Sequence, residues 1–566
     1  MKIIGCTLLC FSLLLSNEIK QVDNEVNLAV QSNEIQNIQN EVITISWLKE
    51  KPKSITKDFY IWQYLKQKNI TPSQSLEAIS QVKYMNNKIF YEFAKKFNHD
   101  ETYAVAQCMR AKTKSLINQP VDCIRVGLSI YDATKLSYDD LDSIYERIKP
   151  HYPQYAKELK IINSTIPFTK LVSSPKDIFF GVFNNCGSVF RSKYFNYAIP
   201  SRSLKRLKND KRFESSISKI VLNKDLVKLQ ESILKIDDKN YSSQTSFYLA
   251  INAIRHNKLE LALGYLENSY KKAYSSFDKD KIRFWQYQIS KENQYLEDLL
   301  NSRSINTYSL LIKEENSKPL ENIFYNIELS KNSLPNNEFN ISDPFNWVKL
   351  IRQTKKGVSL KQYLAYEEIY NTPQTLPFLA FTKEIYEKYT NSYFITPYMD
   401  QFKSDDINKQ ALLYAIARQE SRFIAGSVSS AYALGIMQIM PFLGKELASR
   451  LKEDFKTTDL LDLNRNIKYA KVHINSLKSR LKHPLYIAYA YNAGEGFVNK
   501  QIFSKKYFTS GRFEPYLSME MVPYKETRKY GNKVLANYYV YYNYFNKDNP
   551  IKLSTLVQTL ILPIPN

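Results

Sequence analysis

The chain has 566 residues and a formal net charge of +23 at pH 7, from 79 Lys and Arg against 56 Asp and Glu. This length exceeds what one hydrophobic core supports, which excludes a single small domain and predicts two or three. The basic balance predicts an anionic partner.

The first residues have the pattern of an export signal. Lys2 gives a positive start, Ile3–Leu15 form a short apolar run, and Ser16 is a small residue where a signal peptidase can cut. A membrane anchor is the alternative, but the run is shorter than the roughly 20 residues that span a bilayer. Cys6 follows a segment that only faintly resembles a lipoprotein box. We therefore expect a signal peptide at 1–16 and a mature protein in the periplasm.

Export bears on the charge and on the cysteines. Nucleic acid is the usual partner of so basic a chain, but a polyanionic wall polymer or a membrane surface suits an exported protein better. Cys108 and Cys123, on neighbouring predicted helices, can bridge in an oxidising compartment and leave Cys186 unpaired. Buried unpaired thiols are the alternative. The five histidines are scattered and no CxxC pair occurs, so we expect no metal and no other cofactor.

Residues 17–334 are predicted to form an array of amphipathic helices. Seven of the 13 glycines lie at or after Gly426, so the earlier part has few positions that need positive φ, as helices joined by short turns require. Apolar residues recur at helical spacing in 248–253 and 259–266, on either side of a polar turn at 256–258. Paired helices of this length predict an α-superhelical solenoid, with most tyrosines in its core.

A short helical linker domain is predicted at 335–395. The boundary is the Leu-Pro-Asn-Asn sequence at 334–337, Asp343 opens the module, and Ser359 starts a further helix. A mainly helical C-terminal domain then covers 396–566. The chain as a whole is predicted to be all-α.

Glu420 lies at the end of a predicted helix and on its apolar face. Asp405 and Asp406 are suited to cap this helix. A carboxylate on an apolar stripe loses hydration, which raises its pKa and suits it to act as a general acid. The alternative is a glutamate that bends away to pair with Arg418 or Arg422, and the stripe alone favours that alternative.

Three later segments mix amides, hydroxyls and aromatic rings, as sugar-binding sites do. They are the polar loop Ser427–Ser430, the segment Leu434–Pro441 and the helix end Ala488–Gly496. Taken singly, Tyr491 is more readily a core residue and Met437 a packing residue.

Four motifs in order resemble those of the soluble lytic murein transglycosylases, whose catalytic domain has a goose-type lysozyme-like fold. They are Ala417–Ser421, Gly435–Pro441, Ala490–Gly494 and Glu520–Tyr530. Any one of them is a weak signal, whereas four in order are specific. In the family's long forms a helical superhelix closes into a ring with the catalytic domain on it, which fits the array upstream.

The resemblance implies a role for each matching residue. Glu420 corresponds to the family's sole catalytic acid/base. Residues that hold the N-acetylated sugars or lie in the same cleft correspond to Ser429, Met437, Gln438, Tyr491, Asn492, Glu520 and Tyr530. The chain departs from the family at Tyr432-Ala433-Leu434, where small residues are usual, and this puts the local loop shape in question.

The resemblance also implies a reaction that uses neither water nor a cofactor. Glu420 would protonate the oxygen between N-acetylmuramic acid and N-acetylglucosamine, then take the proton of the muramyl 6-hydroxyl, which closes a 1,6-anhydro ring. This chemistry serves cell-wall turnover and remodelling. A hydrolytic muramidase and a catalytically silent wall-binding scaffold stay open, as do peripheral envelope association and binding to cell-wall synthesis or remodelling proteins. The expected partner is the peptidoglycan glycan strand, not nucleic acid.

Overall fold

The protein is described by a computed structural model that covers residues 43–327 and 339–561. The predicted signal peptide and the predicted boundary at 334–337 lie outside these residues. Within them, strands are limited to β1 (Ile323–Phe324) and β2 (Ser392–Tyr393), which pair in parallel, and the remaining regular structure is helical. The all-α prediction is confirmed. Of the helices described, none is both long and apolar enough to span a bilayer.

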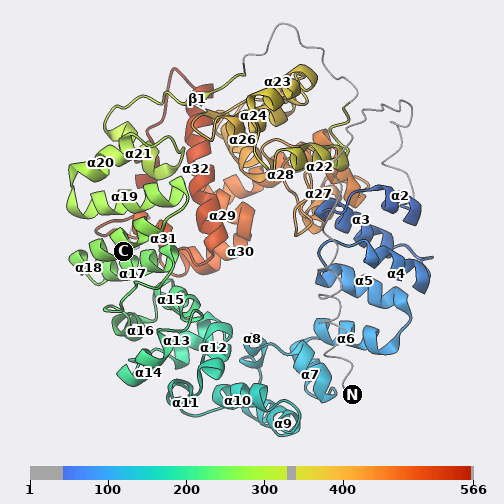
Figure 1. The fold of residues 1–566 in the computed structure, drawn as a ribbon, viewed down its shortest axis with the longest axis vertical. Coiled ribbons are helices and arrows are strands. Elements are labelled where there is room, and N and C mark those ends of the chain that lie inside the picture. Colours follow the sequence, from blue (N-terminus) through green and yellow to red (C-terminus); the bar gives the residue numbers. More distant parts are fainter. Residues whose placement is uncertain (1–42, 328–338, 562–566) are drawn as a thin grey trace. The chain divides into compact units, whose positions relative to one another are not determined.

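The first part of the chain is a succession of short helices that follow one another in chain order (Figure 1). Their bounds are α2 (Ile45–Glu50), α3 (Ile55–Leu65), α4 (Pro72–Ser80), α5 (Asn87–Phe97), α6 (Asp100–Arg110), η1 (Thr113–Leu116), α7 (Val121–Gly127), α8 (Ile130–Ala133), α9 (Tyr138–Ile148), α10 (Pro153–Ile162), α11 (Pro167–Ser173), α12 (Lys176–Asn185), α13 (Ser188–Tyr194), α14 (Ser201–Leu207), α15 (Phe213–Val221), α16 (Val227–Ser232), α17 (Ser243–Arg255), α18 (Leu259–Lys272), α19 (Ser276–Ser290), α20 (Asn293–Leu300) and α21 (Thr307–Glu315). The helix pair predicted around 256–258 is present as α17 and α18, and Asn257 closes their turn with a φ of 53°. Neighbouring helices pack on one another, as an array of paired helices requires.

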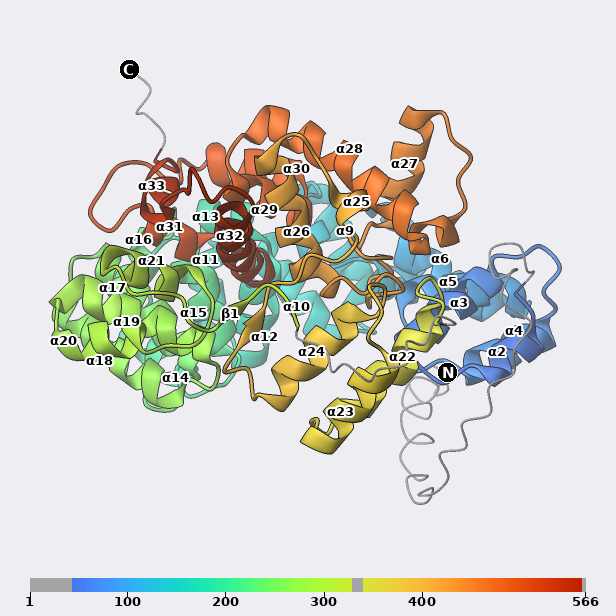
Figure 2. The same cartoon turned by 90° about the horizontal axis from the view of Figure 1, so that it is seen from above.

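Three helices follow the second gap in the described residues: α22 (Pro344–Gln353), α23 (Leu360–Ile369) and α24 (Leu376–Tyr386). Asp343 caps α22, and Ser359 caps α23 with Gln362 in a reciprocal capping box, which confirms both predicted starts. Helix α23 packs on α24 (Figure 2). Trp347 and Phe378 form a small apolar cluster with Ile424, four residues after Glu420, so these helices support the end of the helix that carries Glu420.

The last part of the chain is built on two long helices that pack on each other. Its elements are α25 (Met399–Phe402), α26 (Ile407–Ser421), α27 (Pro441–Leu451), η2 (Thr457–Leu461), α28 (Leu463–Leu481), α29 (Pro484–Ala493), α30 (Glu495–Phe497), η3 (Val498–Phe503), α31 (Tyr516–Met521), α32 (Lys525–Phe545) and α33 (Leu553–Gln558). Helix α26 lies along α32, and residues 411–417 of α26 are all buried. Asn537 of α32 donates its side-chain amide to the carbonyl of Ala415 at 3.2 Å, which satisfies a polar group inside this contact.

The helical array contacts the last part of the chain near both of its ends, and also between them, where Lys224 donates to the carbonyl of Lys506 at 3.0 Å. Near the end of the array, the hydroxyl of Thr307 on α21 donates to the carbonyl of Asn532 on α32 at 3.0 Å. Near its start, the side-chain amide of Asn86 donates to the hydroxyl of Tyr432 at 2.7 Å. The array therefore holds the last part of the chain at both of its ends.

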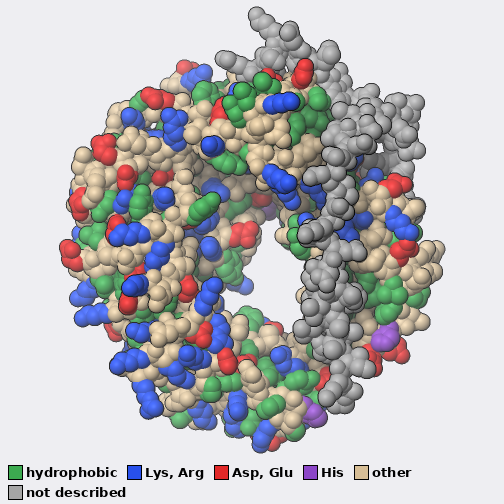
Figure 3. Space-filling model, in the orientation of Figure 1, with side chains coloured by type: hydrophobic (Ala, Val, Ile, Leu, Met, Phe, Trp, Pro, Cys, Tyr) green, Lys and Arg blue, Asp and Glu red, His purple; other side chains and the backbone are tan. Residues whose placement is uncertain are grey.

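The described residues contain one disulfide, and their surface charge is dispersed. Cys108 and Cys123 form a disulfide, and Cys186 is free and buried, so the structure adopts the bridged alternative. Lys and Arg side chains are spread over the face shown in Figure 3 rather than gathered in one basic arm.

Candidate active site

Glu420 lies in the last turn of α26. Asp406 caps the start of this helix by accepting from the backbone of Lys409, and Arg422 ends it with a left-handed φ of 53°. The cap at the start of the helix is a sequence signal, whereas Arg422 adopts the left-handed conformation that glycine or asparagine usually supplies at a helix end. The apolar face of α26 packs on α32, which brings Glu420 to the side of Tyr530.

The arginines that flank Glu420 do not pair with it. Arg418 binds the buried carboxylate of Glu384 at 2.9 Å, and Arg422 binds the other oxygen of the same carboxylate. Burial acts to raise the pKa of Glu384, but the two arginines outweigh it and the pKa is lowered. Glu384 therefore takes up both positive charges. The pairing that the helix pattern alone favoured is wrong.

The surroundings of Glu420 favour its protonated form at neutral pH. Burial is the largest effect and raises its pKa to about 7. The Tyr530 hydroxyl donates to Oε1 of Glu420 at 2.7 Å, which stabilises the carboxylate and lowers the pKa somewhat. The negative charge of Glu526, one turn before Tyr530 on α32, acts in the opposite sense. A carboxyl group with a pKa near 7 can donate a proton and then accept one.

Two phenols accompany Glu420. Tyr530 is almost fully buried, and Tyr491 donates its hydroxyl to the carbonyl of Met437 at 2.7 Å. The pKa of both phenols is raised well above the ordinary value, first by burial and then by the charge of Glu420. They are therefore hydrogen-bond donors throughout the neutral range. Asn492, next to Tyr491, accepts from the hydroxyl of Thr527 at 2.7 Å, which ties α29 to α32.

The segment 427–439 is a tight loop held from three helices. Asn466 of α28, fully buried, accepts from the N–H of Met437 at 2.8 Å and donates to the carbonyl of Leu434 at 3.0 Å. Ser421, at the end of α26, donates to the carbonyl of Ile436 at 2.7 Å. Gly435 has a φ of 78°, and a Cβ there would collide with Asn466 and with a carbonyl of η2. The loop therefore has one position relative to Glu420.

Two predicted binding residues serve the loop itself. The Ser429 hydroxyl accepts from the N–H of Ala433 at 2.9 Å, and its proton remains available to a ligand. The Gln438 side chain donates its nitrogen to the carbonyls of Ser427 and Gly435, at 3.1 and 2.7 Å. Both side chains are partly exposed.

Two other predicted binding residues do not present their side chains at the surface beside Glu420. The Met437 side chain is fully buried, and only its carbonyl takes part, through Tyr491. Glu520 is 2% exposed and accepts from the hydroxyl of Tyr308 on α21, inside the contact with the helical array. The geometry thus gives Glu520 a place in the interior rather than beside Glu420.

Sequence reasoning missed two residues of this site. Glu526 is exposed, and its negative charge raises the pKa of Glu420. Glu520, in the same motif, has no such effect. The signal for Glu526 was its spacing, because it precedes Tyr530 by four residues on one helix face. Asn466 was detectable as a lone amide on the apolar face of the α28 segment, beside Leu463 and Ile467.

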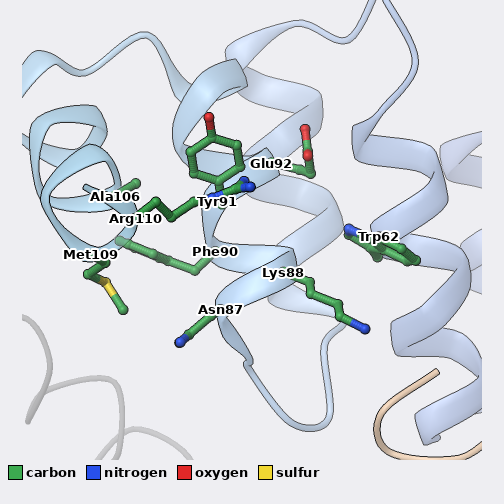
Figure 4. Close-up of a pocket in the computed structure, with 9 residues that line it drawn as sticks. All are labelled: Trp62, Asn87, Lys88, Phe90, Tyr91, Glu92, Ala106, Met109 and Arg110. Atoms are coloured by element: carbon green, nitrogen blue, oxygen red, sulfur yellow. The ribbon is translucent and has the colours of Figure 1, made fainter. Parts of the chain in front are cut away.

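Two of the cavities formed by the described residues lie outside this site. One, of about 290 Å³, is lined by residues of α3, α5 and α6 and is shown in Figure 4. Its aromatic faces are covered: Lys66 lies 3.4 Å above the Trp62 ring, and Arg110 lies 3.8 Å from the centre of the Tyr91 ring. Tyr432 stacks on Trp62 as well. These rings are therefore not an open platform for a sugar.

The second cavity, of about 600 Å³, is strongly basic and is bordered by α19, the segment 302–305 and α26. Its cationic lining residues are Lys279, Arg283, Arg303, Lys388, Arg418 and Arg422, and its acidic ones are Asp280, Asp298 and Glu384. Lys279, Arg303 and Lys388 form no ion pair with any described residue, and all three are exposed. The lining of this cavity therefore carries an excess of positive charge that no acidic side chain of the described residues neutralises.

Comparison with known proteins bears on the segment that carries Glu420. Residues 398–511 match the transglycosylase SLT domain. This stretch contains Glu420, the loop 427–439 and Tyr491, and it ends before Glu520 and Tyr530.

Curated relatives are similar to this chain over stretches of comparable length. A putative soluble lytic murein transglycosylase of Haemophilus influenzae is 34% identical over 138 residues, which are 24% of this chain and 23% of the relative. The soluble lytic murein transglycosylase of Escherichia coli K12 is 32% identical over 163 residues, 28% of this chain and 24% of the relative. The similarity therefore spans about a quarter of the length of these relatives.

A solved structure is similar over a longer stretch at lower identity. The 70 kDa soluble lytic transglycosylase of Escherichia coli aligns with 92% of this chain and 84% of its own, with 15% identity and a TM-score of 0.44.

Proposed function

We propose that the chain is a lytic transglycosylase that cleaves the bond between N-acetylmuramic acid and N-acetylglucosamine in peptidoglycan. The observation that carries the proposal is the state of Glu420, a carboxyl group with a pKa of about 7 that is bound by Tyr530 and left free by both neighbouring arginines. The match of residues 398–511 to the transglycosylase SLT domain supports it.

The proposed reaction needs one carboxyl group. Protonated Glu420 donates its proton to the glycosidic oxygen, the bond from that oxygen to C1 of the muramyl sugar breaks, and the substrate's acetamido group stabilises the positive charge at C1. Ionised Glu420 then accepts the proton of the 6-hydroxyl while O6 bonds to C1, so Glu420 ends as it began. The Tyr530 hydroxyl stabilises the ionised stage by its hydrogen bond. A hydrolase normally needs a second carboxylate, to activate water or to form the covalent intermediate.

Digestion of purified peptidoglycan by the full-length protein tests this proposal. Mass spectrometry of the released muropeptides is expected to show 1,6-anhydro ends, which are lighter than hydrolysed ends by one water. Products with reducing ends would replace the proposal by a hydrolytic muramidase. Binding without any released product would replace it by a wall-binding scaffold.

The pH dependence of kcat/KM is expected to carry the signature of Glu420. Because the acid form is the donor, kcat/KM falls above pH 7, by about tenfold per unit. In Tyr530→Phe the carboxylate loses a hydrogen bond, so its pKa rises and the fall begins at higher pH. In Glu526→Gln a like charge is removed, so the pKa drops and the fall begins at lower pH. Shifts of the same sign in both variants would contradict this assignment.

The basic cavity supports a second element of the proposal, an anionic wall polymer as partner of an exported, periplasmic protein. We expect the double charge reversal Lys279→Glu/Lys388→Glu to reduce cosedimentation with purified walls several-fold at low salt, with the difference shrinking as salt rises. The matched control is Lys157→Glu/Lys170→Glu, which changes the net charge equally on exposed positions of α10 and α11. Equal losses in both variants would mean that only the total charge matters.

A further inference from the structure

Tyr432 connects the loop after Glu420 to the start of the helical array. Its side chain is 1% exposed although its φ of 67° is left-handed, a conformation unusual for a bulky residue. The ring lies nearly parallel to Trp62 of α3, with centroids 5.3 Å apart, and meets Phe59 edge-on at 5.6 Å. Its hydroxyl accepts from the side-chain amide of Asn86 at 2.7 Å. The backbone strain at Tyr432 is thus offset by the contacts that its ring and hydroxyl make with the helical array.

A second contact fixes the backbone beside Tyr432. Lys88, in the first turn of α5, donates to the carbonyl of Ala431 at 2.8 Å, and its ammonium lies 5.1 Å from the centre of the Tyr432 ring. Trp62 and Lys88 both project from the helices of the array in Figure 4. The loop is therefore held by a ring stack, a hydrogen bond to a side chain and a hydrogen bond to the backbone.

Short steps lead from Tyr432 to the groups around Glu420. The N–H of Tyr432 donates to the carbonyl of Ser429 at 2.9 Å, and the N–H of Ala433 donates to the Ser429 hydroxyl. Further along the same loop, the carbonyl of Met437 receives the hydroxyl of Tyr491. A displacement of Tyr432 would therefore move Ser429 directly and Tyr491 through the loop.

We infer that Tyr432 is a positioning residue, through which helices α3 and α5 set the place of the loop 427–439 beside Glu420. The inference rests on the proposed function for its catalytic consequence. Because a misplacement of about 1 Å can lower a rate about 100-fold, a contact remote from the reacting atoms can control kcat. The helical array then influences the rate of the reaction as well as contacting the part of the chain that carries Glu420.

Kinetics of four full-length variants on purified peptidoglycan test the inference. Tyr432→Ala is expected to lower kcat by about tenfold or more with a smaller change in KM. Tyr432→Phe keeps the ring stack and is expected to recover most of kcat. Asn86→Ser keeps a cap for α5 but is too short to reach Tyr432, so it removes the same hydrogen bond as Tyr432→Phe and should likewise keep most of kcat. The double variant Tyr432→Phe/Asn86→Ser should be no slower than the slower single variant, because both remove the same bond.

A matched control separates positioning from stability. Tyr155 is buried in the array and donates to the carbonyl of Leu128, with no contact to the loop, so Tyr155→Ala should lower the melting temperature and leave kcat within twofold. Equal kcat in Tyr432→Ala and Tyr155→Ala would overturn the inference.

Hydrogen exchange gives a readout that needs no catalysis. Amides of 427–439 should exchange faster in Tyr432→Ala than in wild type, and unchanged exchange would overturn the inference. A wild-type protein that releases no product while this exchange difference is present would refute the proposed function and leave the positioning role of Tyr432 standing.

Discussion

Replacing Glu420 by glutamine is expected to lower muropeptide release by about 10³-fold or more, because one group serves both proton transfers and general acid–base catalysis alone contributes roughly 10²–10⁴-fold. Binding of the glycan strand should persist. Glutamine has nearly the same shape, and its oxygen can still accept from the Tyr530 hydroxyl. Mass spectrometry of digests and cosedimentation with walls measure the two effects separately.

The stability of the same variant gives an independent check. A folded-state pKa of about 7, above the ordinary 4.5, means that the unfolded chain releases this proton more readily, so wild type loses stability as pH rises between these values. Glu420→Gln lacks this loss. Its melting temperature relative to wild type should therefore rise from pH 4.5 to pH 7 and then level off.

Glu520→Gln is the control that the same motif offers. Glu520 is buried and bound to Tyr308, so its replacement should lower stability and leave the alkaline limb of kcat/KM where it is in wild type. Wild-type release by Glu420→Gln would remove Glu420 from the reaction. Loss of release in Glu520→Gln without loss of stability would place Glu520 in the chemistry instead.

The helices were predictable where their signals are local. Asp343, Ser359 and Asp406 each start a helix as their side chains predict, and the turn at 256–258 separates α17 from α18. What was not predictable is which helices meet across the chain. The contact between Asn86 and Tyr432 joins residues 346 positions apart, and no periodicity or capping rule encodes such a pairing.

The site was predictable to the extent that one helix defines it. The apolar stripe of α26 located Glu420, but the same stripe favoured pairing with Arg418 or Arg422, because nothing nearby in sequence reveals that Glu384 binds both. Within the last motif, resemblance selected Glu520, whereas helix geometry places Glu526 one turn from Tyr530. The motif identified the segment 520–530, and the direction of the side chains determines that Glu526, not Glu520, lies near Glu420.

Replacing Gly435 by alanine is expected to have the largest effect on stability. A Cβ at a φ of 78° is strained by roughly 1–2 kcal/mol. It would also collide with the carbonyl of Leu460 and with the Asn466 amide, whose hydrogen bonds contribute about 1 kcal/mol each. We expect a loss of roughly 3–5 kcal/mol in the transition that unfolds the last part of the chain, measured by urea unfolding.

Gly264→Ala is the matched control for that substitution. Gly264 lies in α18 with nothing within 4 Å of the added carbon, so alanine there should be neutral or stabilise by up to about 1 kcal/mol. Equal urea midpoints of unfolding for the two variants would mean that the loop 427–439 can shift to accommodate the added carbon. If the loop cannot shift in this way, Gly435→Ala must also disturb Tyr491, which donates to the carbonyl of Met437, two residues after Gly435. The protein that remains folded should then have a lower kcat, a loss that destabilisation elsewhere would not produce.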